Sequence, residues 1–197
     1  MLLNSNELIR YDVEVADGMA GVVRDLLLDS QSWAVHHIVI DTDGFLRNHE
    51  VVIGTSDIRE LKLPEETVVL GLTAKEVVAA KTIDVDVHQF SAMELRGYKV
   101  RTEDGEAGEV RGLLVETSTW TIRYFVVATG RWLSERTILL APQAVKSIDR
   151  NGKFVSFDVS RESIEGSPEY DANLELRRDV EAFLHDHYSW PPYWDAS

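Results

Sequence analysis

Residues 11–29 read YDVEVADGMAGVVRDLLLD, and residues 98–116 read YKVRTEDGEAGEVRGLLVE. Both stretches contain a Tyr, an Asp-Gly pair, a second Gly three residues after the first, and an Arg that precedes a pair of Leu residues. Each shared residue of the second stretch lies 87 positions after its counterpart in the first, as Tyr98 does after Tyr11. The same offset aligns residues 7–77 with residues 94–164 without a gap. An offset held over this length indicates a duplicated domain of about 85 residues.

Each copy has the pattern of short β-strands. The first contains VVRDLLLD and WAVHHIVIDT, and the second contains EVRGLLVE and WTIRYFVVAT at the matching positions. Such runs, bounded by Gly, Asp, Asn and Ser, indicate an antiparallel sandwich or barrel. The Asp-Gly pair favours a hairpin, and the second Gly suits a bulge or a tight bend. Because open sheet edges invite aggregation, we expect a mainly β chain with two tandem small β-barrels.

The pattern changes after the second copy. Residues 173–188 place Leu176, Val180, Phe183 and Leu184 at helical spacing, which predicts an amphipathic helix whose apolar stripe lies against a barrel or against a partner chain. Two prolines then end the helix, and the chain finishes in an aromatic tail with Trp190, Tyr193 and Trp194. These rings either fold back onto a barrel or anchor a partner or a second copy of the chain. The predicted domains are therefore residues 1–87, 88–168 and 169–197.

The charge of the chain limits its partners. The 197 residues include 34 acids and 20 Lys and Arg residues, which gives a net charge of −14. This surface repels phosphate backbones and anionic lipids, so we expect no nucleic-acid partner and no membrane insertion. There is no Cys, and the N-terminus lacks the pattern of a signal peptide. We therefore expect a cytoplasmic protein.

No motif predicts catalysis, a metal or a cofactor. The chain has no Walker loop, no Rossmann fingerprint and no Gly-x-Ser-x-Gly elbow, so we expect no catalytic residues and no cofactor. His36 and His37 are neighbours in a predicted strand and point to opposite faces. Asp84, Asp86 and His88 alternate in IDVDVH, which resembles a weak metal site but fits better with the solvated face of a linker strand.

The second copy resembles a known family, the PRC-barrel domain, which is named for the photosynthetic reaction centre. The resemblance lies in DGEAGEVRGLLVE, in WTIRYFVVATGRWLSERTILLAPQAV and in FVSFDVSRESIEGSPEYD. The ending HYSWPPYW also resembles the tail of stand-alone bacterial members. The first copy departs from the family, because Asp43-Gly44-Phe45 replaces the Gly-Trp turn and Gly54-Thr55 replaces Ala141-Pro142.

This resemblance implies two SH3-like barrels with roles in assembly and docking, as in the H subunit of the reaction centre and the ribosome maturation factor. It carries over no catalytic residue. We therefore expect a non-enzymatic interaction or scaffold protein that binds a protein partner or forms a homodimer. The candidate partner-binding residues are Trp132, Trp190, Tyr193 and Trp194. The alternative is a protein that senses a small ligand or a metal at a site between the barrels.

Overall fold

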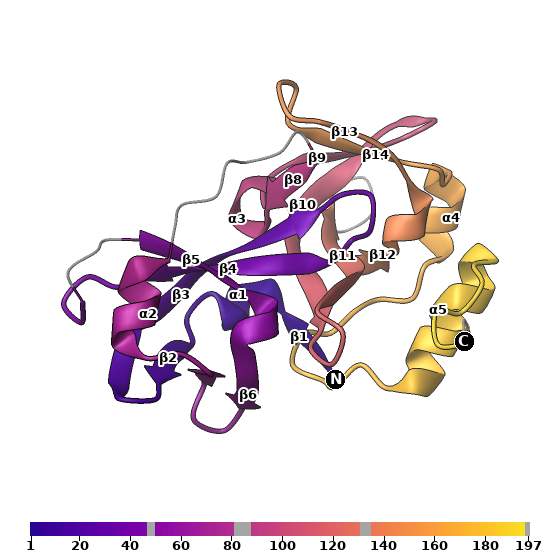
Figure 1. Cartoon of the computed structure of the whole chain (residues 1–197). Coiled ribbons are helices and arrows are strands. Elements are labelled where there is room, and N and C mark those ends of the chain that lie inside the picture. The colour runs from indigo at the N-terminus through magenta and orange to yellow at the C-terminus, as the bar shows by residue number, and fades with distance from the viewer. Residues whose placement is uncertain (47–49, 81–87, 131–134, 196–197) are drawn as a thin grey trace. The chain divides into compact units, whose positions relative to one another are not determined.

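Two β-sheets with the same strand order form the framework of the protein in this computed structural model (Figure 1). The structure describes residues 1–46, 50–80, 88–130 and 135–195. The chain divides into two compact units: residues 1–95 with 112–123, and residues 96–111 with 124–197. The domain bounds predicted at residues 87 and 168 stay predictions.

The first copy supplies the first series of elements. They are β1 (Leu2–Asn4), α1 (Ser5–Leu8), β2 (Asp12–Val15), β3 (Gly18–Asp29), β4 (Val35–Asp41), β5 (Glu50–Gly54), the 3-10 helix η1 (Thr55–Asp57), β6 (Ile58–Lys62), β7 (Thr67–Leu70) and α2 (Ala74–Ala79). The order across this sheet is β5-β4-β3-β2-β7-β6. Strands β2 and β7 are parallel, and the other neighbouring strands on this path are antiparallel.

The second copy repeats the series. Its elements are β8 (Gln89–Ser91), α3 (Ala92–Leu95), β9 (Lys99–Thr102), β10 (Gly105–Glu116), β11 (Thr121–Thr129), β12 (Thr137–Leu140), η3 (Pro142–Ala144), β13 (Val145–Asp149), β14 (Phe154–Phe157) and α4 (Arg161–Gly166). The order across the sheet is β12-β11-β10-β9-β14-β13, which corresponds strand for strand to the first sheet. The prediction that both copies have one topology is confirmed. A further helix, α5 (Arg178–Tyr188), follows.

The second Gly of each turn lies beside a β-bulge, as the sequence predicts. In the first sheet Val13 pairs with Gly21 and Glu14 pairs with Met19, so buried Ala20 is the extra residue. In the second sheet Gly108 occupies the same position after Ala107. A Cβ atom on Gly21 would lie 2.1 Å from the carbonyl oxygen of Asp41 on β4. The sheet therefore bends at a place where only Gly leaves room for the neighbouring backbone.

The prediction of closed barrels is wrong in its detail, because the structure contains two separate sheets whose edges do not pair. The two edge strands of each sheet are consecutive in the chain, since η1 joins β5 to β6 and η3 joins β12 to β13. In each copy a three-residue 3-10 turn joins the two edge strands. Among the described residues, the chain itself connects these strands, and no ladder of hydrogen bonds pairs them.

Two short strands pair with the copy to which they do not belong in sequence. Strand β1 pairs with the end of β10, with Leu3 opposite Val115, and β8 pairs with the end of β3, with Phe90 opposite Leu28. Both pairings lie within the first compact unit. The sequence analysis did not anticipate this reciprocal exchange. Among the described residues, no helix has the length and apolar character that crossing a bilayer requires.

A polar contact fixes one of these exchanged strands. Asp25 on β3 accepts hydrogen bonds from the Ser91 hydroxyl and from the Met93 backbone N–H, at the start of α3. The matching position in the second copy is Gly112, where a Cβ atom would lie 2.8 Å from the side chains of Asn4 and Asn6. The two copies therefore use different residues at equivalent places to seat the helix that follows the exchanged strand.

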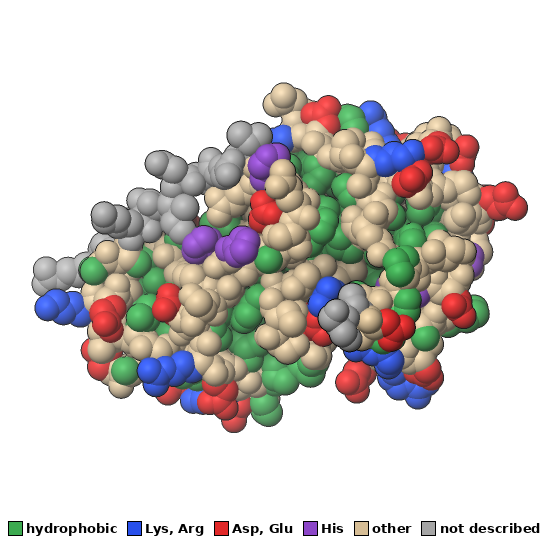
Figure 2. Space-filling model, turned by 45° about the vertical axis from the view of Figure 1, so that its right-hand side comes forward, with side chains coloured by type: hydrophobic (Ala, Val, Ile, Leu, Met, Phe, Trp, Pro, Cys, Tyr) green, Lys and Arg blue, Asp and Glu red, His purple; other side chains and the backbone are tan. Residues whose placement is uncertain are grey.

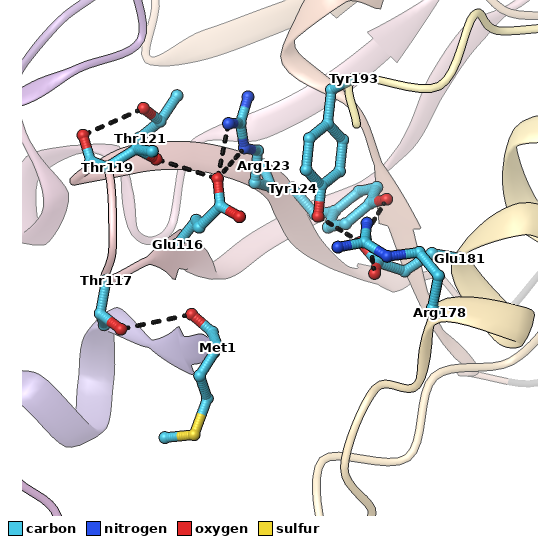
Figure 3. A network of polar contacts seen from close by, with 10 residues as sticks. All are labelled: Met1, Glu116, Thr117, Thr119, Thr121, Arg123, Tyr124, Arg178, Glu181 and Tyr193. Atoms are coloured by element: carbon cyan, nitrogen blue, oxygen red, sulfur yellow. Dashed lines mark hydrogen bonds and ion pairs between the residues drawn. The ribbon is translucent and has the colours of Figure 1, made fainter. Parts of the chain in front are cut away.

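A second polar contact lies in the same unit, at the loop between β10 and β11. Glu116 pairs with Arg123 at 2.5 Å and accepts a hydrogen bond from the Thr119 hydroxyl at 2.9 Å (Figure 3). The carbonyl oxygen of Met1 accepts a hydrogen bond from the Thr117 backbone at 3.1 Å. These contacts hold the first residue of the chain against the loop.

Candidate functional site

The C-terminal helix packs differently from the sequence prediction. Helix α5 begins at Arg178 instead of residue 173, so Leu176 precedes it. Of the predicted apolar stripe, Leu184 is buried, but Val180 is 37% exposed and Phe183 is 63% exposed. The residues that turn inward beside Leu184 are Glu181 and His185, each 3% exposed. No barrel of this chain therefore covers Val180 and Phe183, because polar side chains with buried partners occupy the inward face of α5. The other alternative, a stripe covered by a partner chain, stays a prediction.

Glu181 is the centre of a buried polar cluster in the second unit. Its Oε1 atom accepts hydrogen bonds from the hydroxyl groups of Tyr124, at 3.0 Å, and of Tyr193, at 2.7 Å. Its Oε2 atom lies 3.1 Å from Nη1 of Arg178, one turn earlier on the helix. Figure 3 shows the Tyr124, Arg178 and Tyr193 side chains converging on Glu181. A buried carboxylate is stable only when donors of this kind surround it.

His185 extends the cluster toward the aromatic tail. Its Nε2 atom lies 2.9 Å from the Tyr124 hydroxyl, and its Nδ1 atom lies 3.2 Å from the carbonyl oxygen of Pro191. Burial lowers the pKa of His185, against the opposing influence of the Pro191 carbonyl and the Glu181 carboxylate. Burial also raises the pKa of Tyr124 above its usual value, and the nearby Glu181 charge adds to this effect. These groups are therefore held in place as structural donors and acceptors.

The pH dependence of stability follows from the lowered pKa of His185. Because the folded-state pKa lies below the unfolded value of about 6.5, the contribution of His185 is fully present above that value. This contribution is lost as pH falls from the unfolded pKa through the lower folded-state pKa, since the unfolded chain binds the proton first. We expect His185→Gln to flatten the fall in free energy of unfolding between pH 7.5 and 5.0, measured by urea titration. The exposed His88, changed to Gln, is the control; equal pH profiles for wild type and His185→Gln would contradict the assignment.

The aromatic tail folds back onto α5. Trp190 stacks on Tyr188 with ring centroids 4.2 Å apart and planes 12° apart. The Trp194 ring lies 4.9 Å from that of His185, and the Arg178 guanidinium lies 4.3 Å above Trp194. Of the two alternatives left open by the sequence, these contacts support the one in which the tail packs on the protein. The predicted role of Trp190, Tyr193 and Trp194 in binding a partner stays a prediction, and Trp132 lies outside the described residues.

An apolar groove lies beside the exposed side of α5. It has a volume of about 480 Å³. Its apolar lining comes from β12, from the segment before α5 and from α5 itself, and consists of Leu139, Leu174, Leu176, Val180 and Leu184. We call this surface the α5 groove. Phe183, on the next turn of the helix after Val180, is also exposed. The groove therefore leaves uncovered part of the stripe that the sequence predicted to be buried.

Hydrogen bonds hold the far wall of the α5 groove, the segment of residues 168–177. The Tyr170 backbone N–H donates to the carbonyl oxygen of Thr137, on the edge of β12, at 2.8 Å. The Arg136 guanidinium donates to the carbonyl oxygen of Ser167 at 2.7 Å. The wall is thus attached to the sheet at its start, whereas Leu174 further along is 67% exposed.

The other sequence candidates are not brought together. In the part of the chain that is described, no group of three or more His, Asp or Glu side chains could hold a metal ion. Asp84 and Asp86 lie outside the described residues, and exposed His88 contacts Gln31 at 3.2 Å. The sequence analysis missed Tyr124, Glu181 and His185. Two features of the sequence could have indicated the cluster. Glu181 and His185 are four residues apart, on the same helix face as Leu184, and the second copy has Tyr124 where the first has His37.

Comparison with protein families identifies the second copy. Residues 88–163, from the residue before β8 into α4, match the model of the PRC-barrel domain. The resemblance predicted from the sequence of this copy is confirmed. No curated protein shows significant sequence similarity to the chain.

Proposed function

We propose that this protein is a non-enzymatic interaction module that binds a protein partner at the α5 groove. The observation that carries the proposal is the apolar surface left open beside a PRC-barrel domain, where the lining residues Leu174 and Val180 are 67% and 37% exposed. Side chains of this size, grouped around a groove, favour a site for another molecule. The resemblance to domains with assembly and docking roles supports the same reading.

The polar cluster supports a structural role instead of catalysis. Glu181 and His185 are the pair that an acid–base mechanism would use, but both are buried and already bonded to Tyr124. A catalytic group must reach a substrate atom within hydrogen-bonding distance. Here the rings of the tail residues Trp190 and Trp194 contact the His185 ring. The Tyr193 hydroxyl donates a hydrogen bond to the Glu181 carboxylate. The cluster thus positions α5, and α5 presents the groove.

The test compares two variants on the same helix. Val180→Asp places a charge at the edge of the α5 groove, and Ala182→Asp adds the same charge at an exposed position of α5 that does not line the groove. We expect the full-length protein and Ala182→Asp to retain the same partner from a native lysate of the source cells, and Val180→Asp to lose it. Capture that is equal for both variants would show that the groove is not the binding site.

Binding of a small apolar ligand is a second candidate function. A volume of about 480 Å³ falls within the range of small-molecule pockets, which is roughly 300–1,000 Å³. A ligand that occupies the groove would raise the melting temperature of the wild-type protein in a thermal-shift screen. The same ligand would leave the melting temperature of Val180→Asp unchanged. Protein capture without any ligand-induced shift favours the interaction module.

A further inference from the structure

We propose that the α5 groove binds a cationic amphipathic helix of a partner protein. This inference rests on the proposed function and adds the chemistry of the partner. Val180 and Leu184 lie one turn apart on α5 and line one side of the groove, with Leu174 and Leu176 on the facing wall. An apolar stripe on a second helix packs into a surface of this shape.

The charge around the groove selects a basic partner. Glu169, Asp171 and Glu175 line the groove, and among the residues that the structure describes Arg177 is the only base that does so. Asp179 neutralises Arg177 through two contacts, at 3.1 and 2.7 Å. Among the described residues Glu175 makes no ion pair. Glu169 makes a long one, with its Oε2 atom 3.8 Å from Nε of Arg136. The groove therefore presents a negative potential to a ligand, so Lys or Arg residues beside the apolar stripe of the partner find carboxylates within reach.

The geometry disfavours other occupants. A second copy of this chain would bring a molecule of charge −14 against the same acidic groove. Strand addition at the edge of β12 is opposed because Tyr170 already donates to the Thr137 carbonyl. On the face shown in Figure 2, acidic and basic side chains are interspersed and hydrophobic side chains reach the surface between them. The apolar lining and the acidic margin of the α5 groove together favour a basic amphipathic helix.

The test uses the full-length protein and a labelled synthetic helix of about four turns, with Leu residues on one face and Lys elsewhere. A Leu/Glu peptide of the same pattern and a scrambled Leu/Lys peptide are the peptide controls. Fluorescence anisotropy at low and high salt measures binding to five proteins: wild type, Val180→Asp, Glu175→Lys, and the matched controls Ala182→Asp and Asp186→Lys. Asp186 is an exposed acid on α5 that does not line the groove, and each protein is checked for an unchanged circular dichroism melt.

We expect the Leu/Lys helix to bind wild type more tightly than either control peptide, and more weakly at high salt. Val180→Asp should weaken binding by about tenfold or more, because it buries an unpaired charge. Glu175→Lys should weaken it by roughly threefold, the effect of an exposed ion pair. Ala182→Asp and Asp186→Lys should bind as wild type does.

Three results would overturn the inference: no binding of the Leu/Lys helix, equal binding of the Leu/Glu helix, or unchanged binding by Val180→Asp. If any of these occurs while lysate capture still depends on Val180, the interaction module stands and its partner is not a basic helix. If capture does not depend on Val180 either, the groove is not a docking site and both proposals fall.

Discussion

Gly21→Ala is expected to lower the free energy of unfolding by about 3 kcal/mol or more. The new Cβ atom would lie 2.1 Å from the Asp41 carbonyl oxygen and 3.0 Å from an Ile40 methyl group. Gly21 also has a φ of +152°, a conformation that L-residues rarely adopt. Because the obstacle is the backbone of β4 in the middle of a sheet, no side-chain rotation relieves it. A loss of this size lowers the melting temperature by about 6 °C or more in a chain of this length.

The same substitution can be tested independently in the second copy, at the equivalent Gly108. Gly108→Ala places a Cβ atom 2.3 Å from the Ala128 carbonyl oxygen and should destabilise the second unit by a similar amount. The matched control is Gly18→Ala, where φ is +145° but no atom lies within 4 Å of the new Cβ, so backbone strain alone, about 1–3 kcal/mol, is expected. Hydrogen exchange would show which unit opens in each variant. Melting temperatures of Gly21→Ala and Gly108→Ala within a degree of that of Gly18→Ala would refute the close approach.

Deleting residues 189–197 is expected to destabilise the second unit by about 3 kcal/mol. The deletion removes the Tyr193 hydroxyl from Glu181 and the Trp190 ring from Tyr188. It also uncovers His185, which the Trp190 and Trp194 rings contact. Burial raises the pKa of Tyr188 to about 12 in the intact protein, and loss of the stacked Trp190 ring would expose one face of this phenol. Thermal melts and sedimentation at matched concentration measure the loss and any change of mass.

A conservative variant separates the hydrogen bond from the packing. Tyr193→Phe keeps the ring and removes one of the two hydroxyl donors to Glu181, which should lower stability by about 1.5–3 kcal/mol, the range for a hydrogen bond to a charged group. Exposed Asp195→Ala is the control within the tail. If the deletion leaves the melting temperature unchanged, the tail does not anchor α5, and the account of the buried cluster must be abandoned.

Features that depend on neighbouring residues could be predicted from the sequence. The 87-residue offset predicts two copies with one strand order, and the structure has that order in both sheets. The Asp-Gly turn with a second Gly predicts the bulge that the structure contains at Gly21 and Gly108. The motifs of the second copy predict a PRC-barrel domain, which the family match confirms over residues 88–163. The strands and the bulge follow from hydrophobic periodicity and turn chemistry, which act over a few residues and are therefore written in the local pattern. The family rests on the resemblance of the motifs.

The tertiary structure decided which surfaces meet. Tyr124 and Glu181 are 57 residues apart, and their hydrogen bond makes the buried face of α5 a polar one. Hydrophobic spacing alone assigned Val180 and Phe183 to that face, whereas the structure leaves both exposed. The exchange of β1 and β8 was equally invisible, because the pattern of a three-residue strand does not specify its partner among distant strands. Where a buried polar side chain goes is set by donors and acceptors far away in the chain, and no period in the sequence records their positions.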